Sequence, residues 1–314
     1  GATGTGSTVT HAYTTEGTFT ATVTASNSVN SLQAQTQVTL WAMSVEAGPD
    51  QPTVLEGATV LLAATFVDGR ADVVHSAAID WGNGVTATGE VDEALDTIAG
   101  SYAYADNGTY TVTVTLTDDG TPANSVADSL VVTVGNVAPT ATFGNDGPVD
   151  EASAVTVSFT SVLDPGSADT LTYSIDWDND GAWDVEQATP AAQHTWTDNG
   201  TYTVKGRISD DDGAANDYTT DVVVSNATPR VNAGADADII EGGTFISSGS
   251  FTDPGADNWT AAVDYGDGSA VQALALGSDK SFALSHTYDD DGVYTVIVCV
   301  TDDDIAVGCD EVAV

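Results

Sequence analysis

The sequence predicts an all-β protein built from tandem β-sandwich modules. Two observations support this fold class: apolar and polar residues alternate over short segments separated by Gly, Asp, Asn and Pro, and one of these segments recurs at a nearly constant spacing. No window shows a persuasive helical period of about 3.6 residues. About seven strands in a repeat of about 92 residues are typical of a sandwich of two sheets.

The repeat is marked by one phrase that contains an aromatic residue. The four copies read EGTFTATVT (16–24), NGTYTVTVT (107–115), NGTYTVKGR (199–207) and DGVYTVIVC (291–299). Their aromatic residues are 91, 92 and 92 positions apart: Phe19, Tyr110, Tyr202 and Tyr294. A constant period of this length indicates tandem modules.

The phrase has the pattern of a half-buried strand. In 109–117, apolar residues alternate with threonines and therefore share one face: Tyr110, Val112, Val114 and Leu116. The segments 129–134, 155–160 and 220–225 follow a similar pattern. A tyrosine directly after an Asp-Asn-Gly turn, at the start of the penultimate strand, matches the tyrosine corner of immunoglobulin-like sandwiches.

Three full modules fit the repeat: module one (43–136), module two (137–226) and module three (227–314). Residues 1–42 align only with the late strands of a module. We therefore expect the chain to begin inside a module. Either the chain is a piece of a longer protein, or another chain supplies the missing strands.

The charge of the chain is extreme, with 47 Asp and Glu against 5 Lys and Arg and a net charge of −42. Such a surface repels nucleic acid and anionic lipid, and it attracts cations. No apolar run of about 18 residues occurs either, so we expect no membrane insertion. The acidity has two compatible explanations, a solvated surface suited to high salt and a large number of calcium ligands.

Segments of module three carry a resemblance to a known family: FTDPGADNWTAAVDYGDG (251–268), with VDYGDG at its end, and SHTYDDDGVYTVIVCVTDDD (285–304). The chain resembles tandem PKD-type and cadherin-like repeats of bacterial and archaeal surface proteins. The resemblance covers the three modules, and module one departs most, with FVDGRAD (66–72) in place of FTDPGAD. It implies immunoglobulin-like sandwiches in a head-to-tail rod, extracellular placement, a role in spacing, adhesion or assembly, and no catalysis.

Acidic residues fall at the predicted poles of these sandwiches. Strand parity places them so that two neighbouring modules contribute carboxylates to one junction. At the junction of modules one and two, the candidate calcium ligands are Glu56, Asp106, Asn136, Asp164, Asp169 and, from the run 210–212, Asp211. At the junction of modules two and three, they are Glu151, Asp198, Asn226, Asp253, Asp257 and, from the run 302–304, Asp303. Calcium takes six to eight oxygen ligands, so such a set would lock two modules at a fixed angle, which resembles a cadherin junction.

The alternative is that these are ordinary turn residues, because Asn, Asp and Gly favour turns on their own account. The case for metal depends on the same set appearing twice at the corresponding poles. The junction before module one is weaker, since Thr15 replaces the turn Asp and LWAMS (40–44) replaces the linker that contains Asn and Pro.

A further candidate calcium site lies inside module two. DWDNDGAWD (176–184) has the acidic spacing and the glycine of an EF-hand loop. It corresponds to DWGNG and DYGDG in the other modules, so we expect it on a strand-to-loop corner and not between helices. The candidate ligands are Asp176, Asp178, Asp180 and Asp184.

The positions of the histidines indicate a structural role and not a catalytic one. Three of them lie eight residues before the strand aromatic: His11, His194 and His286. Module one has Tyr102 in the same slot, and a slot that accepts either ring is a packing or hydrogen-bonding position. No hydrolase, zinc-protease or phosphate-loop motif occurs.

The two cysteines are placed to face each other. Cys299 lies on the tyrosine strand and Cys309 on the next strand, so a cross-strand disulfide is expected, which suits an oxidising, extracellular location. Two free surface thiols are the alternative.

These features predict a non-catalytic segment of an extracellular or cell-surface protein, stiffened by calcium, that acts as a stalk, an adhesin shaft or a surface-layer or fibre component. The expected partners are neighbouring modules of the same or identical chains, with surface glycan or another cell-surface protein as further candidates. The rival hypothesis is a set of accessory modules of a secreted enzyme that bind polysaccharide or protein. A groove with two or more exposed Trp or Tyr side chains on one module would favour the rival.

Overall fold

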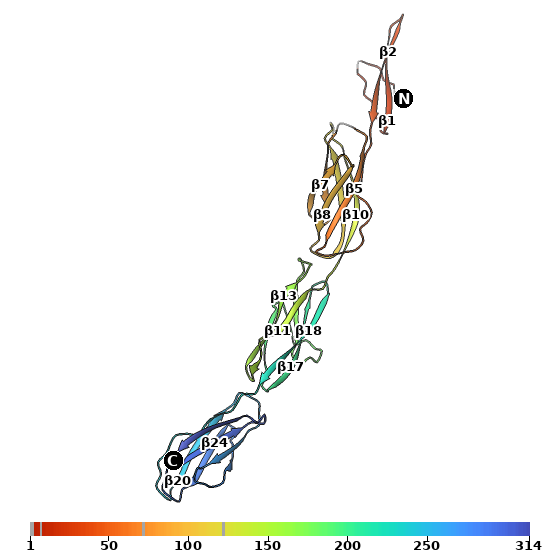
Figure 1. The fold of residues 1–314 in the computed structure, drawn as a ribbon. Coiled ribbons are helices and arrows are strands. Elements are labelled where there is room, and N and C mark those ends of the chain that lie inside the picture. The colour runs from red at the N-terminus through yellow and green to blue at the C-terminus, as the bar shows by residue number, and fades with distance from the viewer. Residues whose placement is uncertain (1–2, 7, 71–72, 121–122) are drawn as a thin grey trace. The chain divides into compact units, whose positions relative to one another are not determined.

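The computed structural model describes residues 3–6, 8–70, 73–120 and 123–314, and every helix or strand element in them is a strand (Figure 1). These residues form two compact units. The first contains residues 1–137 together with the loop 164–169, and the second contains residues 138–163 and 170–314. No helix in the part of the chain that the structure describes is long and apolar enough to cross a membrane.

The first unit begins with a two-stranded sheet of β1 (Gly17–Ser26) and β2 (Ser31–Leu40). The strands pair antiparallel along their whole length, from Gly17 opposite Leu40 to Ser26 opposite Ser31. Within these strands only Phe19 and Ala21 are half-buried, and the other side chains are exposed.

Module one is a sandwich whose two layers are joined into one sheet. Its eight strands follow the order β3-β5-β8-β7-β6-β9-β10-β4. β7 pairs with β8 of one layer and with β6 of the other, so it continues the ladder around one edge. The strands are β3 (Met43–Glu46), β4 (Val54–Leu55), β5 (Thr59–Asp68), β6 (His75–Asp80), β7 (Thr86–Asp92), β8 (Thr97–Ala103), β9 (Gly108–Asp118) and β10 (Ser125–Gly135).

Module two, in the second unit, keeps its layers as separate sheets with the orders β11-β13-β16 and β12-β18-β17-β14-β15. The counterpart of β7 is β15, which has three residues and pairs only with β14. The strands are β11 (Thr140–Asn145), β12 (Val149–Asp150), β13 (Ala154–Leu163), β14 (Thr172–Asp176), β15 (Val185–Gln187), β16 (Ala191–Thr195), β17 (Gly200–Ser209) and β18 (Ala215–Ser225).

Module three repeats this arrangement with the sheets β19-β20-β23 and β22-β21-β24-β25. Here the short strand is β22, which pairs with β21, and a single bridge between Leu276 and Phe282 follows it. The strands are β19 (Arg230–Asn232), β20 (Thr244–Thr252), β21 (Thr260–Asp264), β22 (Gln272–Leu274), β23 (Ser281–Thr287), β24 (Thr295–Thr301) and β25 (Val307–Ala313). The predicted fold class of tandem all-β sandwiches is confirmed.

The core of each sandwich is built from the apolar face of the repeated strand. The inward positions of β9, β17 and β24 are all fully buried: Val112, Val114, Leu116, Val204, Ile208, Val296 and Val298. Burying one such side chain contributes about 1.5–3 kcal/mol. The two-residue alternation read from the sequence therefore supplies the main stabilising contacts of the modules.

A column of four aromatic rings also recurs in each module. In module two the successive ring centroids of Trp177, His194, Trp196 and Tyr202 are 4.9, 4.5 and 4.9 Å apart. The same column consists of Trp81, Tyr102, Tyr104 and Tyr110 in module one, and of Tyr265, His286, Tyr288 and Tyr294 in module three. The histidine slot of the repeat is therefore a ring-packing position.

The last ring of each column is the tyrosine that was predicted to form a corner. The hydroxyl groups of Tyr110, Tyr202 and Tyr294 each donate a hydrogen bond to the backbone carbonyl four residues upstream, at 3.0, 2.9 and 3.1 Å. In module two the acceptor is the carbonyl of Asp198. The bond therefore ties the turn that carries a candidate ligand to the first residues of β17.

Tyr202→Phe is expected to keep the stack on Trp196 and to lose the hydrogen bond to Asp198. A bond of this kind contributes about 0.5–1.5 kcal/mol, and about 1 kcal/mol lowers the Tm of a module of this size by about 4–8 °C. Thermal and urea unfolding of the full chain measures the loss. Tyr202→Leu is the control, because it removes the ring as well and should cost more. A Tyr202→Phe variant that unfolds like the wild type would contradict the role given to the hydroxyl.

Candidate metal sites

The second unit contains a cluster of five acidic side chains that come from four different loops. Glu151 follows β12, Asp198 lies in the turn before β17, Asp253 and Asp257 lie between β20 and β21, and Asp302 follows β24. Carboxylate oxygens of Glu151, Asp198 and Asp257 lie within 4.8 Å of one another, and those of Asp253, Asp257 and Asp302 do so as well. Asp257 belongs to both groups, so the five side chains form one cluster, which we call the acidic cluster.

The acidic cluster is largely removed from water. Glu151 is 1%, Asp302 4%, Asp257 7% and Asp253 8% exposed, while Asp198 is exposed. Buried carboxylates in proteins are almost always paired, because an isolated charge is costly to desolvate. No Lys, Arg or His among the described residues forms an ion pair with these five side chains.

Backbone amides hold one oxygen of several of these carboxylates. Oε1 of Glu151 accepts a hydrogen bond from the N–H of Ala227 at 2.9 Å, and Oδ1 of Asp253 accepts one from the N–H of Gly255 at 2.9 Å. Oδ1 of Asp302 accepts one from the N–H of Ala306 at 2.7 Å. Each of these carboxylates is thereby fixed in orientation.

The remaining oxygens are buried without a donor. Within the described chain, no hydrogen bond reaches Oε2 of Glu151, Oδ2 of Asp253, either carboxylate oxygen of Asp257 or Oδ1 of Asn226. Asn226 donates its side-chain N–H to Oδ2 of Asp302 at 3.0 Å, so its amide oxygen belongs to the same place. Buried polar atoms normally have a partner, so this set of oxygens requires an explanation.

The loop that carries Asp253 and Asp257 is shaped to approach Glu151 closely. A backbone bond from the N–H of Ala256 to the carbonyl of Thr197, 2.8 Å long, fastens the loop to module two. Gly255 sits between the carboxylates, where an added Cβ would collide with the side chains of Asp257 and Glu151. Only glycine fits at this point while the carboxylates remain together.

The electrostatics of the acidic cluster disfavour its charged state. Burial raises the pKa of Asp257 to about 7, and the charges of Glu151 and Asp253 add to the effect. Burial also raises the pKa of Glu151, against the hydrogen bond from Ala227. A divalent cation would reverse this balance, since an opposite charge favours the ionised carboxylates.

The donor set fits calcium. Calcium prefers six to eight oxygen ligands from carboxylates, carbonyls and amides. The acidic cluster together with the amide of Asn226 offers such oxygens and no nitrogen or sulfur ligand.

A similar group lies in the first unit. Carboxylate oxygens of Glu56, Asp164 and Asp169 lie within 4.8 Å of one another, and Glu56 is buried. Oε1 of Glu56 accepts a hydrogen bond from the N–H of Val137 at 2.6 Å, as Glu151 does from Ala227. Asp106 is exposed, with a carboxylate oxygen within 4.8 Å of one of Asp169.

Two predicted ligands have hydrogen-bond partners of their own. Both oxygens of Asp303 accept hydrogen bonds from Asn258, at 3.1 and 3.0 Å, and it is the neighbouring Asp302 that the structure brings into the acidic cluster. Asp211 accepts a hydrogen bond from the N–H of Thr170 at 2.8 Å. The sequence contained the signal for Asp302, because it continues the two-residue period of buried Val298 and Val300.

The loop 176–184 groups three of its four candidate ligands. Carboxylate oxygens of Asp176, Asp178 and Asp184 lie within 4.8 Å of one another. The oxygens of Asp176 accept hydrogen bonds from the N–H groups of Asp180 and Gly181, at 3.2 and 2.9 Å. The side chain of Asp180 accepts a hydrogen bond from the N–H of Ala182 at 2.8 Å. These carboxylates therefore already have partners in the loop.

Cys299 on β24 lies directly opposite Cys309 on β25, and the structure joins them by a disulfide. This bond crosses a hairpin in the layer whose end carries Asp302.

His75 is a titratable residue outside the repeated ring position of the other three histidines. It is the first residue of β6, its side chain is 4% exposed, and its ring packs on Phe66 at 4.8 Å between centroids. Its ring nitrogens contact Glu93 at 2.9 Å and Asp68 at 3.2 Å. Asp119 is the further acidic group at this place, since its charge acts on Glu93.

Comparison with known proteins identifies similar sequences and folds. A sequence profile of the PKD domain matches residues 136–224 and 226–314, and a second PKD-domain profile matches residues 1–40. No curated protein matches the sequence significantly.

The search of solved structures returned several tandem-repeat proteins. One is the tetra-tandem repeat in the extending region of a large adhesion protein, which is 18% identical. The alignment covers 95% of this chain and 81% of that chain, with a TM-score of 0.38. Drosophila N-cadherin EC1-4 is 15% identical, with 94% and 82% covered and a TM-score of 0.28. The I67-I69 fragment of titin is 9% identical, with 87% and 96% covered and a TM-score of 0.32.

His75 and His194 are expected to titrate on opposite sides of the ordinary histidine pKa of about 6.5. Burial lowers the pKa of His75, but its hydrogen bonds to Glu93 and Asp68 outweigh burial and raise it. Burial lowers the pKa of His194, which lies between two tryptophan rings. NMR titration of the imidazole signals of the full chain measures both values, with His75→Gln and His194→Gln for assignment.

Because the pKa of His75 is raised in the folded state, the stability of the first unit is expected to fall as the pH rises. The contribution of His75 is fully present below about pH 6.5 and is lost as the pH rises through the higher folded-state value. His75→Gln should therefore reduce the loss of unfolding free energy of the first unit above neutral pH. A folded-state pKa of His75 at or below the ordinary value would contradict this account.

Proposed function

The chain belongs to the PKD-domain family, and we propose that it is a non-catalytic segment of an extracellular structural protein whose consecutive domains are braced by calcium. Such a segment would serve as a stalk, an adhesin shaft or a surface-layer or fibre component. The observation that carries the proposal is the acidic cluster of the second unit, in which Glu151, Asp253 and Asp257 have buried oxygens without a partner among the described residues.

The residues that would hold calcium at this place are the five members of the acidic cluster and the amide oxygen of Asn226. Glu151 and Asp198 belong to module two, while Asp253, Asp257 and Asp302 belong to module three. The ion would supply the positive charge that their shared burial requires. Because both modules contribute ligands, binding would favour the conformation in which the two modules stay together.

A similar group of residues in the first unit extends the proposal to that unit. Glu56, Asp164 and Asp169, with Asp106 and the buried amide of Asn136, have the same residue types and the same backbone anchor as the acidic cluster. We assign Asp211 and Asp303 to positioning of the loops beside these sites. Asp176, Asp178 and Asp184, with Asp180 beside them, are a third candidate site that lies inside one module.

The extracellular location is supported by chemistry as well as by family. A disulfide such as Cys299–Cys309 persists in oxidising surroundings. PKD-type repeats are typically non-catalytic, and three histidines that could suggest catalysis contact aromatic rings. His194 and His286 stack on a ring, and His11 meets Tyr13 edge-on. The expected partners are neighbouring modules of the same or identical chains, with surface glycan or another surface protein as candidate ligands.

The described aromatic side chains give less support to an accessory module that binds polysaccharide. Trp183 lies under Lys205 and Arg207, both at 5.1 Å from its ring centre, and Trp259 lies under Lys280 at 3.9 Å. Trp41 is 52% exposed. These tryptophans come from three different modules or linkers and do not line one groove.

Calcium is expected to raise the Tm of the second unit, and Asp257→Asn is expected to remove most of this gain. At a calcium concentration of about 100 times the Kd, binding to the folded state alone adds about 2.7 kcal/mol, which raises the Tm of a domain of this size by about 10–20 °C. Calorimetry of the full chain with calcium and with chelator measures the difference, and small-angle scattering under the same conditions reports its dimensions. In chelator, Asp257→Asn should be more stable than the wild type, because it removes one charge from the acidic cluster.

Asp289→Asn is the matched control, since Asp289 is an exposed acidic residue outside the acidic cluster. It should leave the calcium response as in the wild type. Equal unfolding temperatures with calcium and with chelator would contradict the proposed function.

A further inference from the structure

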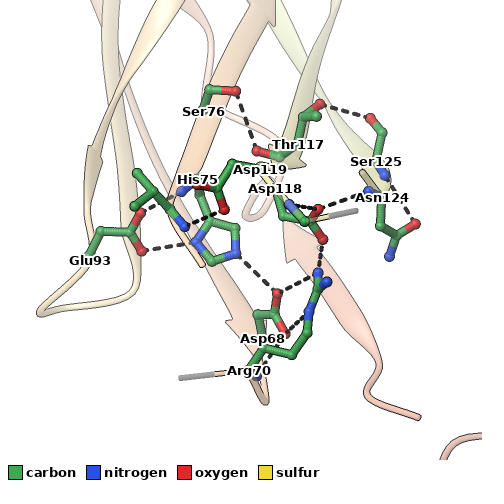
Figure 2. A network of polar contacts seen from close by, with 12 residues as sticks. Asp68, Arg70, His75, Ser76, Glu93, Thr117, Asp118, Asp119, Asn124 and Ser125 are labelled. Carbon is green, nitrogen blue, oxygen red and sulfur yellow. Dashed lines mark hydrogen bonds and ion pairs between the residues drawn. The ribbon is translucent and has the colours of Figure 1, made fainter. Parts of the chain in front are cut away.

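One of the five basic residues of the chain occupies a pole of module one (Figure 2). The Arg70 guanidinium donates to Oδ2 of Asp68 at 3.2 Å and pairs with Oδ2 of Asp118. The side chains of Asp68 and Asp118 are 2% and 0% exposed. A single cation therefore bridges two carboxylates whose side chains are buried.

Asp68 and Asp118 occupy the same places in module one as Asp253 and Asp302 in module three. Asp68 ends β5, and Asp253 follows β20 directly. In both, Oδ1 accepts a hydrogen bond from the N–H two residues later, at 3.0 Å from Arg70 and 2.9 Å from Gly255.

The second pair matches equally well. Asp118 ends β9, and Asp302 follows β24 directly. Oδ1 of Asp118 accepts hydrogen bonds from the N–H groups of Gly120 and Asn124, both at 2.9 Å, as Oδ1 of Asp302 accepts one from Ala306 at 2.7 Å. The backbone of this pole is thus built in the same way in the two modules.

Within the loop after this strand, the two poles differ at the position of Arg70. The sequences DGRAD (68–72) and DPGAD (253–257) place Arg70 where module three has Gly255. At Gly255 a side chain would collide with the carboxylates of Asp257 and Glu151. Asp72, the counterpart of Asp257, lies outside the described residues.

The segment before module one also lacks the residues that correspond to the other candidate ligands of the acidic cluster. The linker 40–44 has no counterpart of Asn226, and Thr15 stands where module two has Asp198. Trp41 from this linker packs against Gly69, where an added Cβ would collide with its ring. The residues that precede module one therefore bring an aromatic side chain to this pole in place of acidic ligands.

We propose that Arg70 takes the place of a divalent cation at this pole of module one, so that Asp68 and Asp118 share a cation without calcium. This inference rests on the proposed function, because it compares the pole with the calcium site of the second unit. Arg is charged at all physiological pH values and its fork of donors suits two carboxylates. Since the cation is part of the chain, its occupancy does not depend on the calcium concentration.

The charge state of Asp68 agrees with this assignment. Burial raises its pKa, but hydrogen bonds from the backbone and the guanidinium of Arg70, together with the one from His75, outweigh burial and lower it. Asp257, the buried carboxylate four residues after the counterpart of Asp68, has no such partner among the described residues, and its pKa is raised.

Local hydrogen exchange of the full chain, with calcium and with chelator, tests the proposal. The amides of Gly120 and Asn124 report on the Arg70 pole, and those of Gly255 and Ala306 report on the acidic cluster. In the wild type we expect calcium to slow exchange at the second pair only. In Arg70→Gly, about 10 mM calcium, roughly ten times the Kd of a weak extracellular site, should slow exchange at the first pair by about tenfold.

Arg70→Lys is the control, because it keeps a cation and should show no calcium response at Gly120 and Asn124. A wild-type response at these two amides equal to that at Gly255 and Ala306 would overturn the inference, and this comparison does not require Arg70→Gly to fold. Absence of a response in folded Arg70→Gly, while Gly255 and Ala306 respond, would overturn it as well. Absence of a response at Gly255 and Ala306 would instead contradict the proposed function.

Discussion

The structure depends on the neutralisation of carboxylates that the fold buries at the ends of its sandwiches. In Glu151 and Asp253 one oxygen accepts a hydrogen bond from a backbone N–H, and the second oxygen is buried without a donor among the described residues. Several carboxylates then lie close together away from water. The cost of desolvating their charges is offset only when a positive charge lies among them. Module one carries that charge as Arg70, whereas no basic side chain among the described residues forms an ion pair with the acidic cluster, and Lys280 donates only to the backbone carbonyl of Asp253.

The same strands that build the cores also deliver these carboxylates. In β9 and β24 the buried alternation ends on an aspartate, Asp118 or Asp302, which therefore points to the same side as the apolar residues before it. The position of this aspartate is thus fixed by the core packing of its strand and needs little support from the loop. Loops such as 253–257 add the remaining oxygens, and a glycine gives them the close approach that they require.

Much of the fold was predictable from the sequence, because period and alternation are properties of the chain alone. The tyrosine corner and the ring slot of His194 followed from the repeat, whereas the joining of two layers by β7 did not, since strand length at a sheet edge depends on tertiary pairing. For the acidic cluster, residue types and poles were predictable, but the choice between Asp302 and Asp303 depended on strand phase. In the sequence Arg70 is only a departure from a motif, because its role depends on the ion pair with Asp118, which is far away in sequence.

The aromatic columns keep the same four ring positions in every module, while the type of ring at a position varies. Each column keeps its four positions, yet the first position holds Trp81, Trp177 or Tyr265 and the second holds tyrosine or histidine. The rings exchange without loss of the stack, so the interior tolerates sequence drift after duplication. Modules with similar interiors can therefore carry different poles. A repeated module can acquire a new response to its surroundings through changes in its loops and linkers, while its core stays the same.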